Sequence, residues 1–154
     1  MQTNLSLRDA QLAVLDRIEL LQAEIISTQL AYGRVLAETI VSTRTIPPGD
    51  CSAMDGYAVI ASDLEKVPVT LTIAAYLPAG ATFDGTLKPG QAARIFTGAS
   101  VPAGANAIVM QEYTNANDDF VTIEKSVEEG HYIRPAGLDF KLRISVVVFV
   151  DPST

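Results

Sequence analysis

The sequence predicts an α+β fold that is mostly β, in which an N-terminal helical unit is joined to a small all-β domain. Three observations predict this fold: apolar residues recur at helical spacing before position 26, two prolines stand together at Pro47-Pro48, and a strand-like alternation begins at Val69. The chain has 154 residues, of which 48% are hydrophobic and 19% are charged, so it can bury a core and does not have a disordered composition. This length fits one domain, or one small domain and part of a second.

The N-terminal unit is predicted to begin with one amphipathic helix. Ser6, with Asp9 three positions later, forms a loose capping box at its start. A shorter helix is expected over 28–36, and 36–41 then has the character of a strand. The stripe that predicts the first helix has apolar residues three or four positions apart, at Leu7, Ala10, Val14, Ile18, Leu21 and Ile25.

The double proline is expected to end the helical unit, because proline fixes φ and has no backbone N–H to donate. Beyond it, Val69, Leu71 and Ile73 alternate with Thr70, Thr72 and Ala74, as in a strand with one buried face. Turns rich in Gly, Pro and Asn separate several of the apolar runs, which predicts a small barrel or sandwich. The other runs that we interpret as strands are 57–61, 91–96, 106–112 and 119–124.

The last apolar run, residues 145–150, is interpreted as a strand that pairs with 36–41. This pairing would make the β block an insertion in the helical unit. The predicted domains are therefore 1–45 together with 142–154, and 46–141. A compatible alternative is that the chain is the front part of a longer protein.

Charge and composition argue against several classes of protein. Eleven Lys and Arg against eighteen Asp and Glu give a net charge of −7, which repels a nucleic acid backbone. No apolar run approaches the roughly 18 residues of a membrane-spanning helix, and the N-terminus lacks the pattern of an export signal. The single cysteine, Cys51, is expected to be an inert thiol, and a reduced, cytoplasmic setting is the default expectation.

Two polar corners of the β block form the candidate site. Residues 52–59 place the Asp55 carboxylate at one corner, and residues 94–99 end an apolar run at Thr97-Gly98. A carboxylate, a hydroxyl and glycine amides at strand ends are groups that can meet a ligand. Each corner also has a simpler interpretation: Asp55 as a turn residue that bonds its own backbone, and Thr97-Gly98 as a turn that only ends a strand.

These segments resemble the N-terminal region of the MoeA family, the molybdopterin molybdenumtransferases, which include the E domain of gephyrin. The resemblance covers about residues 5–140. It departs from the family pattern at Tyr132, where members usually have Asn, and at Gly137-Leu138-Asp139, where they usually have Gly-Glu-Asp. The three motifs that carry it are 52–59 with the prolines before it, 94–105, and 130–139.

The resemblance implies an enzyme that inserts molybdate into adenylated molybdopterin with Mg²⁺, which releases AMP and gives molybdenum cofactor. It implies that Asp55 holds Mg²⁺ or orients a water, and that Thr97 donates to an anionic oxygen beside the Gly98 amide, with Asp55 and Thr97 as the catalytic pair. The residues that it implies for substrate binding are Ser52, Gly98, Arg134 and Asp139.

The resemblance also implies a homodimer of the full-length protein, in which the partner subunit completes the site, and it permits a MogA-like adenylyltransferase as a further partner. The MogA-like domain and the C-terminal domain of the family have no counterpart in these 154 residues, so we expect the chain alone to be inactive.

Other interpretations of function and of single residues stay open at this point. The chain can be a non-catalytic dimerisation or interaction module of the same family, or a stand-alone β domain that binds an oxyanion. Arg134 can be an ordinary surface ion-pair residue. His131 stands apart from other ligand-type residues, so we do not expect it to bind a metal.

Overall fold

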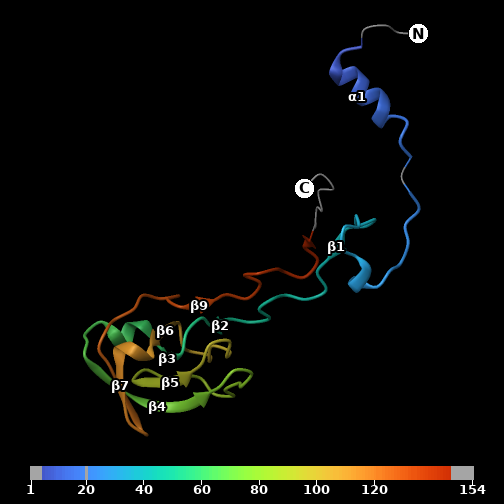
Figure 1. Ribbon diagram of the computed structural model, residues 1–154. Helices are drawn as coiled ribbons and strands as arrows, with labels where there is room; N and C mark the ends of the chain where they lie inside the picture. Colours follow the sequence, from blue (N-terminus) through green and yellow to red (C-terminus); the bar gives the residue numbers. More distant parts are fainter. Residues whose placement is uncertain (1–4, 20, 147–154) are drawn as a thin grey trace. The chain divides into compact units, whose positions relative to one another are not determined.

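The computed structural model describes residues 5–19 and 21–146, which fall into two compact units (Figure 1). Within these residues the first unit ends at Thr39, and the second runs from Ile40 to Val146. The second unit contains the whole of the predicted β block.

The first unit contains α1 (Leu7–Leu15), which begins as predicted. The hydroxyl of Ser6 accepts from the Asp9 amide at 3.2 Å and donates to the Asp9 carboxylate at 2.6 Å. The helix ends at Leu15, so the prediction that the stripe stays helical as far as Ile25 was wrong. No residue of α1 is buried, and a short helix without a packed apolar face gains little stability from propensity alone.

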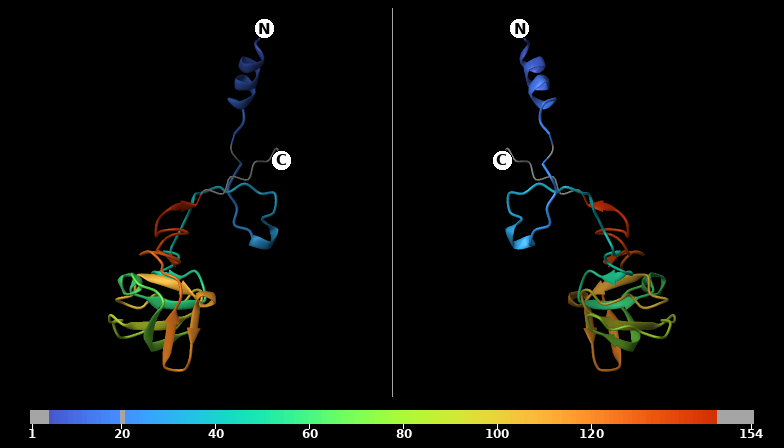
Figure 2. Two further views of the ribbon diagram at one scale, coloured as in Figure 1. Left: turned by 90° about the vertical axis from the view of Figure 1, so that its left-hand side faces the viewer. Right: turned by 90° about the vertical axis from the view of Figure 1, so that its right-hand side faces the viewer.

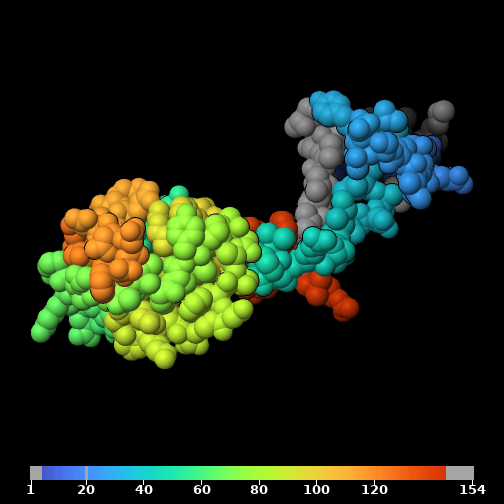
Figure 3. All heavy atoms as spheres, turned by 90° about the horizontal axis from the view of Figure 1, so that it is seen from below, coloured from blue at the N-terminus to red at the C-terminus, as the bar shows by residue number. Residues whose placement is uncertain are grey.

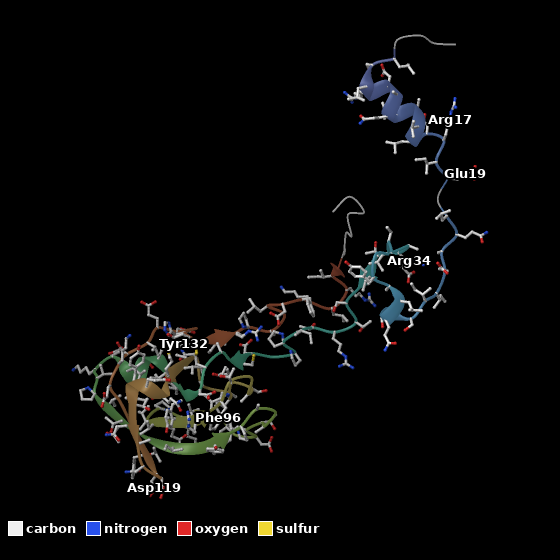
Figure 4. All side chains as sticks on the ribbon, in the orientation of Figure 1. Arg17, Glu19, Arg34, Phe96, Asp119 and Tyr132 are labelled. Carbon is white, nitrogen blue, oxygen red and sulfur yellow. The ribbon has the colours of Figure 1, made fainter. Side chains whose placement is uncertain are left out.

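The shorter helix predicted over 28–36 is reduced to the 3-10 turn η1 (Thr28–Leu30). Gly33 follows with a φ of 74°, a left-handed conformation that does not continue a helix. Arg34, which is labelled in Figure 4, forms an ion pair with Glu24. The predicted strand over 36–41 is likewise shortened, to β1 (Ile40–Val41).

The second unit is built on a curled six-stranded sheet in the part of the chain that is described. The strands are β3 (Gly56–Val59), β4 (Val69–Leu77), β5 (Gln91–Ile95), β6 (Ala107–Met110), β7 (Thr114–Ala116) and β8 (Phe120–Ile123). Their order is β6-β3-β5-β4-β8-β7, and all neighbours are antiparallel except β4 and β5. The edge strands β6 and β7 are separated only by the 3-10 turn η3 (Gln111–Tyr113), so the sheet must curl to bring its edges close (Figure 2).

Two core clusters lie on opposite faces of β3, whose four residues are all buried. Tyr57 and Val59 belong to one cluster, with apolar residues of β4, β5, β6 and β8, while Ala58 belongs to the other. Segments far apart in the sequence pack into one continuous surface in this unit (Figure 3). Burial on both faces makes β3 a rigid support for the residues at its ends.

Most predicted strands are confirmed, with ends that shift by a few residues. The main difference is β7 (Thr114–Ala116), which was not among the predicted strands. Its residues are polar or small and lie at an edge of the sheet, where alternation with apolar residues is not required.

Two short antiparallel pairs and one further turn complete the second unit. They are β2 (Cys51–Ser52) with β9 (Ile133–Arg134), β1 with β10 (Ser145–Val146), and the 3-10 turn η2 (Ala61–Leu64). The expected pairing of the last run with the strand near position 40 is therefore present at Ser145 and Val146, while 147–150 lie outside the described residues. Within the described ranges, no helix is long and apolar enough to cross a membrane.

Candidate functional site

The fold brings the two predicted polar corners together. Asp55 directly precedes β3, Thr97 lies two residues after β5, and Gly56 is paired with Ile95 between these adjacent strands. The backbone N–H and the hydroxyl of Thr97 both donate to Oδ1 of Asp55, each at 2.8 Å. Both residues are exposed, so the pair lies at the surface of the β unit. It offers a fixed carboxylate to a ligand.

The two donors of Thr97 favour the ionised form of Asp55. The backbone N–H of Thr97 lowers the pKa of this carboxyl group most, followed by the Thr97 hydroxyl, while Arg94 adds a smaller coulombic lowering that partial desolvation opposes. Because the pKa is lower in the folded state than in the unfolded state, this contact stabilises the fold above the unfolded pKa. The contribution is lost as the pH falls through the folded pKa.

Replacing Thr97 with valine is expected to raise the pKa of Asp55 part of the way to its ordinary value. Valine removes the hydroxyl donor and keeps the backbone N–H, which is the larger influence. Serine at the same position keeps both donors, so the pKa of Asp55 should equal that in the parent chain. A carbon-detected NMR titration of the Asp55 carboxyl measures both variants. Equal pKa values in Thr97→Val and Thr97→Ser would show that the hydroxyl does not act on Asp55.

Oδ2 of Asp55 accepts no hydrogen bond from any described residue, so it is the atom that can face a cation or a water. In the described ranges, no three His, Cys, Asp or Glu residues form a group that could hold a metal ion. Mg²⁺ commonly takes one or two protein carboxylates and completes its shell with phosphates and waters. Asp55 therefore fits as one ligand of such an ion, but not as a complete site.

The expected oxyanion donors are already used inside the protein. The Thr97 hydroxyl proton goes to Asp55, and the Gly98 amide donates to the Ser52 carbonyl at 2.9 Å. Gly98 has a φ of 82°, the left-handed conformation that turns the chain back toward β2. In this conformation neither group is free to donate to a substrate, and both hold the two corners together.

Ser52 is a buried residue that shapes the loop before Asp55. It is 1% exposed, and its hydroxyl donates to the Met54 carbonyl at 2.6 Å and accepts from the Met54 amide at 3.3 Å. This local turn explains why the serine precedes the acid by three positions. The structure gives the Ser52 hydroxyl a supporting place rather than one open to a substrate.

Arg134 and Asp139 form a second pair. Nη2 of Arg134 lies 2.8 Å from Oδ1 and 2.9 Å from Oδ2 of Asp139, and both side chains are about two-fifths exposed, at 42% and 39%. The loop between them is anchored by the Ala136 amide, which donates to Asp50 at 2.9 Å. No hydrogen bond or ion pair between described residues joins this pair to Asp55 or Thr97. Four of the predicted site residues therefore form two separate pairs, Asp55 with Thr97 and Arg134 with Asp139.

Arg94 was not predicted as a site residue from the sequence. Its Nη1 donates a hydrogen bond to the carbonyl of Gly56, the residue after Asp55, at 2.8 Å. One signal could have found it, since Arg94 stands inside β5 among Ala92, Ala93 and Ile95, all fully buried. A charged residue within a buried strand needs hydrogen-bond partners, which is a reason to look for what it holds.

The departure from the family pattern at Tyr132 falls on a left-handed residue with a φ of 55°. Asn adopts the left-handed conformation more readily than most residues, so Asn is well suited to position 132. The Tyr132 carbonyl accepts from the Ala53 amide at 2.9 Å, and its ring packs against His131 with the ring centroids 4.2 Å apart. Tyr132 therefore adopts the left-handed conformation in this chain.

Comparisons with known proteins agree with this arrangement. The family described as "MoeA N-terminal region (domain I and II)" matches residues 5–147. The molybdopterin molybdenumtransferase of Nostoc sp. is 44% identical over 115 residues, which are 72% of this chain and 26% of the relative. That of Haemophilus influenzae is 40% identical over 121 residues, which are 78% of this chain and 30% of the relative.

A similar solved structure is that of the molybdopterin biosynthesis moeA protein from Pyrococcus horikoshii. It is 36% identical in sequence with a TM-score of 0.81, and the match covers 91% of this chain and 38% of that one. The chain therefore spans less than two-fifths of the length of these relatives.

Proposed function

Because the chain belongs to the MoeA family, whose N-terminal region it matches, we propose that it is the N-terminal region of a molybdopterin molybdenumtransferase. Such an enzyme inserts molybdate into adenylated molybdopterin and forms molybdenum cofactor. The observation that carries the proposal is the contact of Asp55 with Thr97. It joins the first two family motifs and leaves one ionised carboxylate oxygen at the surface.

In this proposal Asp55 acts through a cation or a water, because a carboxylate repels molybdate and the phosphates of the substrate directly. Mg²⁺, when bound, would neutralise charge on the reacting oxyanions. Asp55 would hold the ion through Oδ2, and Thr97 would keep Oδ1 in place. Thr97 is thus proposed as the anchor of the carboxylate rather than as a donor to the substrate.

The other predicted residues are proposed to support or complete the site. Ser52 and Gly98 would hold the loops that carry Asp55 and Thr97, since their polar groups are used there. Arg134 would bind an anionic group next to Asp139, since only its Nη2 is used in the bonds to Asp139.

Next to Thr97 the described residues place one carboxylate, that of Asp55, and no group of three possible metal ligands, so other domains and the partner subunit of a homodimer would provide the rest of the pocket. We also propose that the β block is an insertion in the helical unit. The pairing of β1 with β10 supports this, because it returns the chain to the place where the block begins.

The experiment uses a chimera in which this chain replaces the matching N-terminal segment of the Nostoc enzyme. With adenylated molybdopterin, molybdate and Mg²⁺, we expect the chimera to release AMP and to form cofactor, and the 154-residue chain alone to release none. A folded, dimeric chimera that releases no AMP would contradict the proposal. Efficient AMP release by the chain alone would contradict the view that the site is shared with other domains.

One observation favours a second function, a non-catalytic dimerisation or interaction module. The helix α1 has no buried residue, and apolar side chains such as Leu7 and Leu15 are 77% and 62% exposed. An amphipathic helix without a packed face is typical of a segment that docks on another chain or domain. In this case Asp55→Asn and Thr97→Val in the chimera would leave cofactor synthesis unchanged.

A further inference from the structure

Arg94 lies in the middle of the β unit, where a charge has to be balanced by hydrogen bonds. It stands on β5 between two paired strands, opposite Tyr57 of β3 and Tyr76 of β4. Its neighbours Ala93 and Ile95 are fully buried, and its own side chain is half-buried. A guanidinium group in such a place is costly unless its donors are used.

The donors of Arg94 are used on two different segments. Nη1 donates to the Gly56 carbonyl at 2.8 Å, and Nη2 donates to the Gln111 side-chain oxygen Oε1 at 2.6 Å. The guanidinium carbon lies 4.4 Å from the centre of the Phe96 ring and 5.2 Å from that of Tyr57. Two hydrogen bonds and an aromatic ring fix the plane of the side chain.

Three of these contacts reach residues that adjoin Asp55 or Thr97: Gly56, Phe96 and Gln111. Gly56 follows Asp55, and Phe96 precedes Thr97. Gln111 also contacts Asp55 directly, because the backbone N–H of Gln111 donates to the Asp55 carbonyl at 3.1 Å. Arg94 therefore joins the three segments whose relative position decides whether the Asp55 carboxylate meets Thr97.

We propose that Arg94 is a positioning residue for Asp55, which it holds against Thr97 through Gly56 and Gln111. The effect of this positioning on catalysis rests on the proposed function. Lysine cannot replace it, because one ammonium group lacks the planar fork that spans the two acceptors. The positive charge alone is not what the site requires.

The test measures the pKa of Asp55 by NMR titration in Arg94→Lys, Arg94→Met and Gln111→Met. We expect all three to raise this pKa toward its ordinary value, because the Thr97 donors no longer meet Oδ1. Gln111→Met removes one anchor from an exposed side chain and keeps the charge of Arg94, so it remains informative if Arg94→Met does not fold. The control is Arg44→Lys at an exposed position of the same unit, where no change is expected.

Two outcomes would overturn the proposal. The first is an unchanged pKa of Asp55 in Arg94→Lys and Gln111→Met, which would show that the site keeps its geometry without the arginine fork. The second is a rise in Arg94→Met alone, which would show that only the charge of Arg94 acts on Asp55.

AMP release by the chimera separates this proposal from the proposed function. Arg94→Lys is expected to lower kcat by roughly tenfold or more with a smaller change in KM, because a small displacement of a reacting group is costly. A raised pKa of Asp55 with normal AMP release supports positioning by Arg94 and contradicts the catalytic role of Asp55. A normal pKa with reduced AMP release contradicts positioning and leaves the proposed function standing.

Discussion

Replacing Asp55 with asparagine in the chimera is expected to lower the rate of AMP release by roughly a hundredfold or more, the scale of losing a charged group from a reacting site. Asparagine keeps the shape of the side chain, and its amide oxygen can still accept from both donors of Thr97. It loses the negative charge that would hold Mg²⁺ or orient a water through the second oxygen. The fold should therefore remain while the chemistry fails. Single-turnover AMP release at saturating Mg²⁺ measures the effect.

The control for this substitution is Asp118→Asn. Asp118 is exposed and lies between β7 and β8, away from the strand ends that carry Asp55 and Thr97. The substitution Asp118→Asn therefore removes the same charge at a distant position. We expect its rate of AMP release to equal that of the unsubstituted chimera. Similar rates in Asp55→Asn and Asp118→Asn would contradict a catalytic role for Asp55 and favour the interaction module.

Replacing Gly56 with alanine is expected to destabilise the β unit by about 3 kcal/mol or more, at the upper end of overpacking effects. An added Cβ would lie 1.9 Å from the Val109 carbonyl oxygen and 2.8 Å from its carbon. These are backbone atoms of β6, which pairs with β3 along its length, so they cannot move aside without breaking that pairing. Urea unfolding of the chain, followed by circular dichroism, measures the change.

Gly49→Ala is the matched control for Gly56→Ala. An added Cβ at Gly49 meets nothing within 4 Å, so we expect its free energy of unfolding to stay within about 0.5 kcal/mol of the parent chain. Unfolding of both variants at the same urea concentration would contradict a close contact of β3 with β6 at Gly56. This close contact also explains the glycine that follows Asp55 in the first motif, since only a residue without Cβ lets β3 approach β6 so closely.

The strands of the β unit and the pair of corners were predictable because their signals are local. Alternation at Val69, Leu71 and Ile73 reports one buried face, and glycine and proline mark the turns between strands. Asp55 and Thr97 stand at strand ends, so adjacent strands in a sheet bring them together once the strands pair. The sheet order thus explains why the two residues lie near each other, while the hydrogen bonds between them also depend on side-chain contacts such as those of Arg94.

The remaining features depend on contacts that a pattern does not contain. The apolar stripe of the first helix continues to Ile25, but the helix ends at Leu15, and none of its residues is buried. Ser52 and Gly98 were predicted as substrate-binding residues, and the sequence did not show that the Ser52 hydroxyl and the Gly98 amide bond the backbone. The Ser52 bond is a local turn that serine often forms, whereas the partner of the Gly98 amide is set by the tertiary structure.

The most direct test of the central claim, that Asp55 and Thr97 form one catalytic unit, is a double-mutant cycle on AMP release by the chimera. The four proteins are the parent chimera, Asp55→Asn, Thr97→Val and the double variant. We predict that the double variant is no slower than Asp55→Asn, because Thr97 acts only by holding the carboxylate. Losses that multiply in the double variant would contradict this claim, because each residue would then act independently.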